Sequence, residues 1–190
     1  MKPIILASKS PRRKQLFSLL GLPFKIVDSK YQENFKLKMK PENLAKFFAQ
    51  SKAKAVATHY RNAIVIGADT IIVHQNKIYG KPYTKQKAIQ MLKELSNTTH
   101  WAITGLTVVD SRTGKIISKA VKTKVAFRKI HLDEIISYVR TGEPLHMAGA
   151  YGLWGKAAMF AKKVEGEYCN VVGLPLCELS VILRKFGIKL

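Results

Sequence analysis

The sequence predicts an α/β protein with a mixed, strongly bent sheet and flanking helices, arranged as two lobes around a cleft. Three observations support this prediction. The apolar residues 4–6 lead directly into the amphipathic residues 14–20, as a buried strand leads into a helix. Residues 101–109 and 115–127 read as two strands joined by the turn Ser111-Arg112-Thr113-Gly114, which is an antiparallel hairpin. Apolar residues at helical spacing occupy the segments between the strands, so helices alternate with strands.

The first strand and helix meet at an anion site. Ser10 is suited to cap the helix and Pro11 to occupy its first turn, where no backbone donor is needed. The free N–H groups and the positive end of the helix dipole favour a phosphate there. Arg12 and Arg13 add two guanidinium groups, which pair with phosphate oxygens. The alternative is an ordinary capped helix with two solvated arginines.

The remaining elements follow from turn residues and periodicity. Gly21 ends the first helix, and Pro41 opens a helix that contains Lys52. After the first strand, we expect strands at residues 24–27, at 63–67 with a continuation at 71–73, in the hairpin, and at 159–164. After the first helix, we expect helices at residues 41–59, from the cap Thr84 to 95, at 132–140, and at 176–186. The loop 28–40 is polar, rich in lysine and long enough to suggest a function.

Asp69 stands out because it lies between two apolar strand segments. Burying a carboxylate there is costly unless a cation pairs with it. A metal ligand or a general base at a strand end is one interpretation, and an Asp that forms a turn is the other.

Length and charge limit the functional classes. A chain of 190 residues fits one domain, taken here as residues 1–190, and no apolar stretch approaches the roughly 20 residues needed to cross a bilayer, so a cytoplasmic protein is expected. The formal charge is +21, but 26 of the 33 basic residues are lysines scattered along the chain. Dispersed lysine favours the attraction of a small polyphosphate over sequence-specific nucleic-acid binding. Cys169 and Cys177 are expected to be reduced thiols in or near the core.

Several common motifs are absent. The sequence contains no P-loop motif, no dinucleotide-binding glycine motif after a strand, no zinc-protease motif and no hydrolase nucleophile elbow. The five histidines form no recognisable metal-ligand pair, and each is expected to be a surface or hydrogen-bonded residue.

A set of short segments along the whole chain resembles the Maf family of nucleoside triphosphate pyrophosphatases. The segments that carry the resemblance are, in order, Leu6-Ala7-Ser8-Lys9-Ser10-Pro11-Arg12-Arg13, Glu33, Lys52-Ala53, Gly67-Ala68-Asp69-Thr70, Gly80-Lys81-Pro82, Thr104-Gly105, Glu143-Pro144, Ala148-Gly149-Ala150-Tyr151-Gly152 and Asn170-Val171-Val172-Gly173-Leu174-Pro175. The resemblance implies an inosine triphosphatase-like fold with a deep cleft, frequent homodimers, and cleavage between the α- and β-phosphates to a monophosphate and pyrophosphate.

The resemblance also implies roles for individual residues. Ser8, Arg12 and Arg13 would bind the substrate phosphates, with Lys52 and Lys81 as further cations of the catalytic group. Asp69 would be the general base that activates water, and Glu33 would join it in holding a divalent cation, Mg²⁺ or Mn²⁺. Without the resemblance, Lys52 could be a solvated helix lysine and Glu33 a surface ion-pair partner.

Base preference is expected at Arg12, Thr70 and Trp154. The first two resemble the branch that acts on dTTP and UTP, but Trp154 stands where that branch has Gln, and His146-Met147 where it has Asp-Lys. We therefore expect hydrolysis of dTTP, UTP or a modified nucleotide by a cytoplasmic homodimer without a specific nucleic-acid or membrane partner. The alternative is a non-catalytic basic module that binds nucleic acid.

Overall fold

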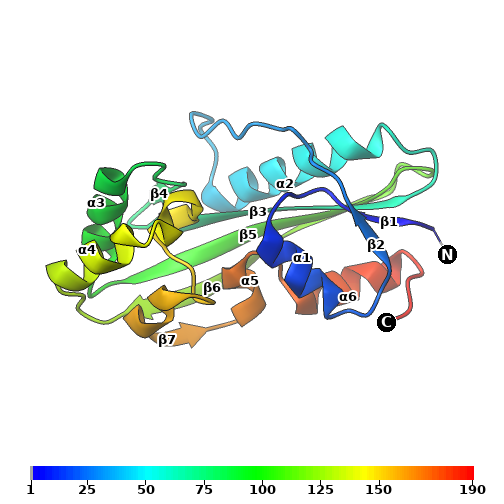
Figure 1. The fold of residues 1–190 in the computed structure, drawn as a ribbon. Helices are drawn as coiled ribbons and strands as arrows, with labels where there is room; N and C mark the ends of the chain where they lie inside the picture. The colour runs from blue at the N-terminus through cyan, green and yellow to red at the C-terminus, as the bar shows by residue number, and fades with distance from the viewer. Residues whose placement is uncertain (1) are drawn as a thin grey trace. The chain divides into compact units, whose positions relative to one another are not determined.

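The computed structural model describes residues 2–190 and contains one mixed sheet with helices packed on it (Figure 1). The strand order is β2-β1-β3-β5-β6-β7, and β4 pairs with β3. The strands are β1 (Ile4–Leu6), β2 (Phe24–Ile26), β3 (Ile64–His74), β4 (Lys77–Tyr79), β5 (Thr99–Asp110), β6 (Ile116–Phe127) and β7 (Ala161–Glu165). The helices are α1 (Pro11–Ser18), α2 (Pro41–Ala57), α3 (Lys85–Leu95), α4 (Leu132–Arg140), α5 (Tyr168–Val172) and α6 (Leu176–Lys185), with 3-10 helices η1 (Glu143–His146), η2 (Ala148–Ala150) and η3 (Lys156–Phe160). The predicted mixed α/β class is confirmed.

The sheet is mixed because its strands pair in both directions. β1 runs parallel to both β2 and β3, and Ile4 is in register with Phe24 and Ile64. β4 returns antiparallel to β3 after a tight turn in which Gln75 and Asn76 have φ of 47° and 62°. β7 pairs antiparallel with β6.

The chain forms two compact units, and β3, β5 and β6 contribute residues to both. The first unit comprises residues 2–69, 104–121 and 173–190. β1 and residues 64–68 of β3 are apolar and buried, because helices cover both faces of the sheet there, as Figure 1 shows for α1 and α6 on one side and α2 on the other. Ile4 and Leu6 pack with residues of α1 and α6, whereas the alternating residues Ile5 and Ala7 pack with α2.

Two glycines let α2 approach the sheet closely. A Cβ atom added to Gly67 of β3 would lie 2.2 Å from the carbonyl oxygen of Ala49, and one added to Gly105 of β5 would lie 1.9 Å from that of Ala45. Both positions therefore admit only glycine while the helix backbone stays where it is. This close approach brings Lys52, on the same helix, within reach of β3.

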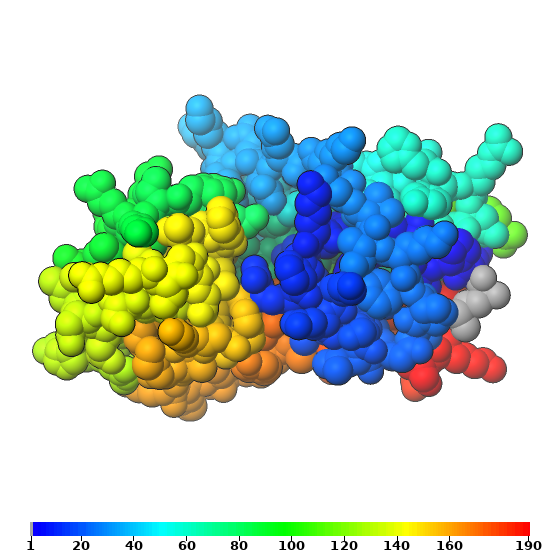
Figure 2. Space-filling view, viewed as in Figure 1, coloured from blue at the N-terminus to red at the C-terminus, as the bar shows by residue number. Residues whose placement is uncertain are grey.

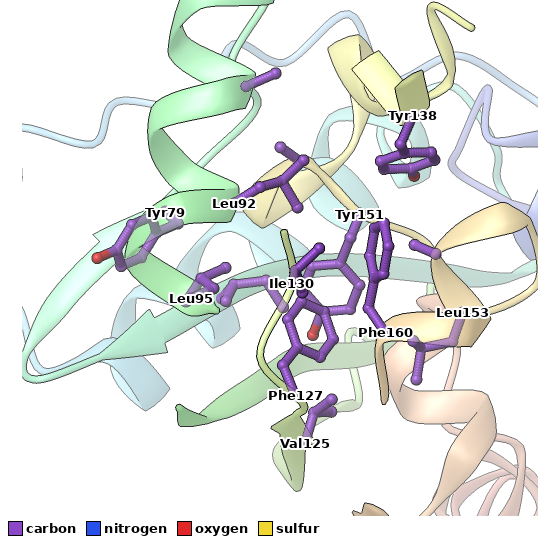
Figure 3. Close-up of a cluster of buried hydrophobic side chains, with 14 of the residues drawn as sticks. Tyr79, Leu92, Leu95, Val125, Phe127, Ile130, Tyr138, Tyr151, Leu153 and Phe160 are labelled. Carbon is purple, nitrogen blue, oxygen red and sulfur yellow. The ribbon is translucent and has the colours of Figure 1, made fainter. Parts of the chain in front are cut away.

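The second unit comprises residues 70–103 and 122–172 and has its own apolar core. Figure 3 shows side chains from α3, β6 and the segment 151–160 converging in this core. The rings of Phe127 and Tyr151 are in edge-to-face contact, with 4.8 Å between their centroids, and His100 packs against both. His100 Nε2 lies 2.9 Å from the Tyr151 hydroxyl, and burial lowers the pKa of His100 to about 3, so this histidine is a neutral core residue.

Most predicted elements are confirmed, including the caps Ser10 and Thr84 and the hairpin. The prediction that the strand pauses at residues 67–70 is wrong. β3 is continuous, and Asp69 is an interior residue of it, because α2 packs over Gly67 and Lys52 satisfies the carboxylate. The predicted strand 159–164 begins only at Ala161, since the preceding residues form η3 and bury Phe160 in the core.

Cys169 and Cys177 are thiols and not a disulfide pair, as predicted, but only Cys169 is partly buried. Cys169 has intermediate exposure, whereas Cys177 is exposed on α6, so the prediction of a near-core thiol is wrong for Cys177. No helix in residues 2–190 is long and apolar enough to span a membrane.

Replacing Gly105 tests the close packing of α2. In Gly105→Ala, the added methyl group collides with the helix backbone, and we expect the free energy of unfolding to fall by about 1–3 kcal/mol or more. Urea denaturation measures this decrease. Gly21→Ala is the control, because Gly21 has a φ of +67° with nothing within 4 Å, so only backbone strain of about 1 kcal/mol is added. An equal or smaller decrease in Gly105→Ala than in Gly21→Ala would contradict this account.

Candidate active site

Hydrogen bonds among serine and arginine residues order the start of α1. Ser10 caps the helix by accepting a hydrogen bond from the Arg13 backbone N–H at 3.4 Å, and Pro11 occupies the first turn. The buried Ser8 hydroxyl accepts hydrogen bonds from the Ser10 backbone N–H at 3.2 Å and from Arg13 Nη1 at 3.4 Å. Backbone donors, the helix dipole and a guanidinium group therefore meet at one point. Arg12, beside them on the first turn of α1, is partly exposed.

The Arg13 guanidinium is held in a fixed orientation from the far end of the chain. Its Nε donates a 2.7 Å hydrogen bond to the carbonyl oxygen of Gly173. Burial lowers the pKa of Arg13 from its ordinary value and the neighbouring Arg12 lowers it as well, whereas the carboxylates of Asp69 and Glu33 act in the opposite direction. An arginine pKa starts so high that the group remains a cation at neutral pH.

Lys52 brings the two predicted acidic residues together. Its Nζ donates a 2.6 Å hydrogen bond to Glu33 Oε1 and a second hydrogen bond to Asp69 Oδ1. Lys52 is only 8% exposed and Asp69 only 5% exposed, so these charges have left water and stabilise one another. The interpretations of Lys52 as a solvated lysine and of Asp69 as a turn residue are thereby wrong.

Glu33 reaches this cluster because aromatic residues anchor its loop. The loop follows β2 and lies on the molecular surface (light blue in Figure 2). Tyr31 and Phe35, two residues to either side of Glu33, contact Phe48 of α2, with ring centroids 6.3 Å and 5.3 Å apart. Phe48 lies one helical turn before Lys52, so the aromatic contacts hold the loop where Glu33 can reach the lysine.

Asp69 has the properties of a general base. Burial raises the pKa of its carboxyl above the ordinary value, and the charges of Lys52 and Arg13 oppose this rise. A raised pKa makes the ionised carboxylate a better proton acceptor near neutral pH than an exposed aspartate. The nearby cations at the same time keep the ionised form accessible.

The carboxylates of Glu33 and Asp69 are also candidate ligands for a metal ion. Glu33 Oε1 and Asp69 Oδ1 both pair with Lys52 Nζ, so the two carboxylates point toward the same position. Within residues 2–190, no group of three or more His, Cys, Asp and Glu side chains could hold a metal ion. A Mg²⁺ ion commonly takes one or two protein carboxylates and completes its shell with water and substrate phosphates, and this donor set fits that pattern.

The other predicted site residues belong to the second unit. Thr70 is partly buried in β3, and Lys81 is exposed in the segment between β4 and α3. A 3.1 Å hydrogen bond from the Gly149 backbone N–H to the Gly80 carbonyl connects that segment to η2. Trp154 is 37% exposed and folds back over Gly152, where an added Cβ would lie 2.4 Å from the indole.

Glu143 is one of the residues that carry the family resemblance, but the resemblance implies no role for it; the structure places it against the backbone beside Trp154. Glu143 accepts hydrogen bonds from the Tyr138 hydroxyl at 3.0 Å and from the Lys156 backbone N–H at 3.4 Å. A Cβ atom on Gly155 would lie 2.2 Å from Glu143 Oε1, so the glycine admits the carboxylate. The spacing of Gly149, Gly152 and Gly155 was the available signal, since each glycine marks a close approach of other atoms.

Comparison with known proteins gives consistent matches over the whole chain. Residues 3–186 match the family model described as Maf-like protein. A dTTP/UTP pyrophosphatase of Geobacillus sp. (strain WCH70) is 45% identical over 187 residues, which cover 98% of this chain and 100% of that protein. A dTTP/UTP pyrophosphatase of Alkaliphilus oremlandii (strain OhILAs) is 46% identical over 192 residues, which cover 100% of each protein.

A solved structure also resembles this fold. The Staphylococcus aureus Ham1 protein superimposes with a TM-score of 0.54 over 97% of this chain and 99% of that chain, at 14% sequence identity. At that identity the likeness concerns the fold alone.

Removing the Lys52 ammonium should unbalance the buried carboxylates. We expect Lys52→Met to lower the free energy of unfolding by about 3–5 kcal/mol at pH 8. Without the ammonium, the folded-state pKa of Asp69 rises further above the unfolded value of about 3.9. The ionised form then destabilises the fold at high pH, and the destabilisation should shrink as the pH falls toward that value.

Urea denaturation at pH 8 and pH 5 checks this prediction. The control is Lys77→Met, which removes a lysine whose side chain is 56% exposed and whose Nζ donates a 2.6 Å hydrogen bond to Glu94. This exposed pair should contribute about 0–1 kcal/mol. A similar destabilisation in both variants, or a Lys52→Met destabilisation that grows as the pH falls, would contradict the role of Lys52.

Proposed function

The chain belongs to the Maf-like protein family, and on that premise we propose that it is a nucleoside triphosphate pyrophosphatase. The substrate is dTTP, UTP or a related modified nucleotide, and the products are the nucleoside monophosphate and pyrophosphate. The observation that carries the proposal is the buried Asp69–Lys52–Glu33 cluster in the same unit as the anion site at the start of α1. The proposal treats residues 1–190 as one catalytic domain.

The start of α1 binds the phosphates. Ser8 and the backbone N–H groups donate hydrogen bonds to phosphate oxygens, and Arg12 and Arg13 neutralise their charge. Gly173 supports this role, because its carbonyl holds Arg13 Nε and so orients the guanidinium before substrate arrives. We propose Lys81 as a further cation, which would stabilise the leaving pyrophosphate.

Asp69 accepts a proton from the water molecule that attacks the α-phosphorus. The water oxygen forms the new P–O bond, the bond to the bridging oxygen breaks, and pyrophosphate leaves with that oxygen. The raised pKa of Asp69 and its burial support this role. Lys52 holds the carboxylate in place, and its charge favours the ionised form by opposing the rise of the Asp69 pKa.

We propose Glu33 and Asp69 as the residues that would hold a divalent cation, Mg²⁺ or Mn²⁺. When bound, the cation supplies positive charge to the phosphate oxygens. The convergence of both carboxylates on one ammonium group supports this assignment, because the same oxygens can serve a metal ion.

Arg12, Thr70 and Trp154 set the preference among bases. Met147 belongs with them, because a Cβ on Gly152 would lie 2.8 Å from its sulfur and 2.4 Å from the Trp154 indole, so both side chains pack against one glycine. An indole stacks on many bases but offers only one hydrogen-bond donor. We propose a broader base tolerance than a carboxamide would allow. A cytoplasmic homodimer without a specific nucleic-acid partner completes the proposal.

Release of pyrophosphate from a panel of canonical and modified nucleoside triphosphates, with Mg²⁺ and with Mn²⁺, tests the function. In Asp69→Asn, turnover should fall by about 10²- to 10⁴-fold, because the amide keeps the size of the side chain but cannot accept the proton. Nucleotide binding, measured by calorimetry, should persist. Turnover within a few-fold of the parent would exclude Asp69 as the base, and a panel without any hydrolysis would favour the non-catalytic basic module.

Trp154→Gln should narrow the substrate profile toward dTTP and UTP. A site that hydrogen-bonds a base edge leaves polar groups unpaired when the wrong base binds, at about 1–3 kcal/mol each, whereas a stacking face does not. The ratios of kcat/KM across the panel measure the change. Met159→Gln is the control, since Met159 is an exposed apolar residue of the same unit and should leave the ratios unaltered. Unaltered ratios in Trp154→Gln would place Trp154 outside the base pocket.

A further inference from the structure

One face of the second unit carries a tryptophan beneath two lysines. Side chains alternate along β6, and Figure 3 shows Val125 and Phe127 pointing into the buried cluster. Lys122, Lys124 and Ala126 therefore lie on the opposite face of the strand, where Lys122 is exposed and the other two are partly exposed.

Trp101 occupies this face on the neighbouring strand β5. It stands between the buried residues His100 and Ala102 and is 37% exposed. The Nζ atoms of Lys122 and Lys124 lie 4.8 Å and 5.3 Å from the centroid of its ring. Such cation–π contacts are weak at an exposed position, so another planar group can replace the lysines on the ring.

A pocket adjoins the tryptophan along the same strands. It has a volume of about 410 Å³ and is lined by Thr99, Lys124, Ala126, Lys163 and Glu165. Glu165 pairs with Lys163 at 2.6 Å and with Lys124 at 3.4 Å. Together with Lys122, the face holds three ammonium groups and one carboxylate, so it remains net positive. We call Trp101, Lys122, Lys124 and Lys163 the Trp101 surface.

We propose that the Trp101 surface binds single-stranded nucleic acid without sequence preference. An unpaired base stacks on the Trp101 ring, and the displaced Lys122 and Lys124 ammonium groups contact the flanking phosphates. The pocket beside the ring, with Lys163 at its edge, accommodates the next nucleotide of the strand. The formal charge of +21 supports an anionic partner, and the exposed ring selects the single strand, because bases in a duplex have no free face.

This activity does not depend on the proposed hydrolysis. None of the four residues belongs to the Asp69–Lys52–Glu33 cluster or to the start of α1, and all four lie in the second unit. The failure of one proposal therefore leaves the other standing.

Fluorescence anisotropy of a labelled oligothymidylate of about 15 nucleotides tests the proposal with the full chain. Trp101→Ala should weaken binding by about 5- to 100-fold, because it removes the stacking face. Trp101→Phe retains an aromatic face and should stay within a few-fold of the parent. Equal affinity in Trp101→Ala and the parent would overturn the proposal, and so would an equal weakening in the Ala and Phe variants.

The lysines are tested with a matched pair of charge removals. Lys122→Ala combined with Lys124→Ala should lower the affinity and reduce the slope of log K against log salt concentration by about 0.7 for each phosphate that no longer pairs with an ammonium group. Lys87→Ala combined with Lys93→Ala removes the same charge from exposed positions on α3 of the same unit. An equal decrease of affinity in both double variants would mean that only net charge attracts the strand, and would overturn the proposal.

Competition and quenching complete the test. In a Trp154→Phe background, Trp101 is the remaining tryptophan of the two in the chain, and its fluorescence should be quenched by the oligothymidylate. A duplex of equal length should compete poorly with the single strand. Displacement by the duplex at equal concentration, or by dTTP at micromolar concentration, would overturn the proposal, since the strand would then occupy a non-specific surface or the nucleotide site.

Discussion

The candidate active site depends on the ion pairs that the buried ammonium group of Lys52 forms with Asp69 and Glu33. Asp69 lies inside a strand at 5% exposure, where an unpaired carboxylate would cost several kcal/mol. Lys52 offsets that cost and also holds Glu33. The lysine can do so only because α2 lies close to the sheet, and α2 can lie close only because Gly67 and Gly105 have no side chains to separate the backbones. The pairing of the buried charges therefore depends on the close packing of α2 against the sheet.

The start of α1, where we propose that phosphate binds, depends on a different constraint, the position of the chain near Gly173. A guanidinium group on an exposed helix would sample several rotamers and lose entropy when it bound a phosphate. The hydrogen bonds from Arg13 to Gly173 and Ser8 remove that freedom in advance. The C-terminal segment thereby orients a side chain at the start of the fold, which explains how residues at opposite ends of the chain can serve one site.

The acidic and the basic residues of this protein play different electrostatic roles. The chain has only 12 acidic residues against 33 basic ones, and several of the acids sit in defined contacts, among them Asp69, Glu33 and Glu143. The scattered lysines supply a general positive field that draws polyanions. Specific recognition requires additional geometry, such as the fixed fork of Arg13 or the exposed ring of Trp101, because a field alone does not distinguish one anion from another.

The local features of this protein can be predicted from its sequence. The capped start of α1, the helix around Lys52 and the long hairpin follow from residues that are neighbours in the chain, because caps, turns and periodicity are short-range properties. Asp69 stands out from the apolar segments on either side of it, and the family resemblance added Glu33. Three further features come from long-range contacts. Asp69 lies inside a continuous strand, the contacts of Tyr31 and Phe35 with Phe48 hold Glu33 near Lys52, and Glu143 accepts a hydrogen bond from the backbone near Trp154. Each of these depends on contacts between residues far apart in the sequence, where packing and the pairing of buried charge override local preference.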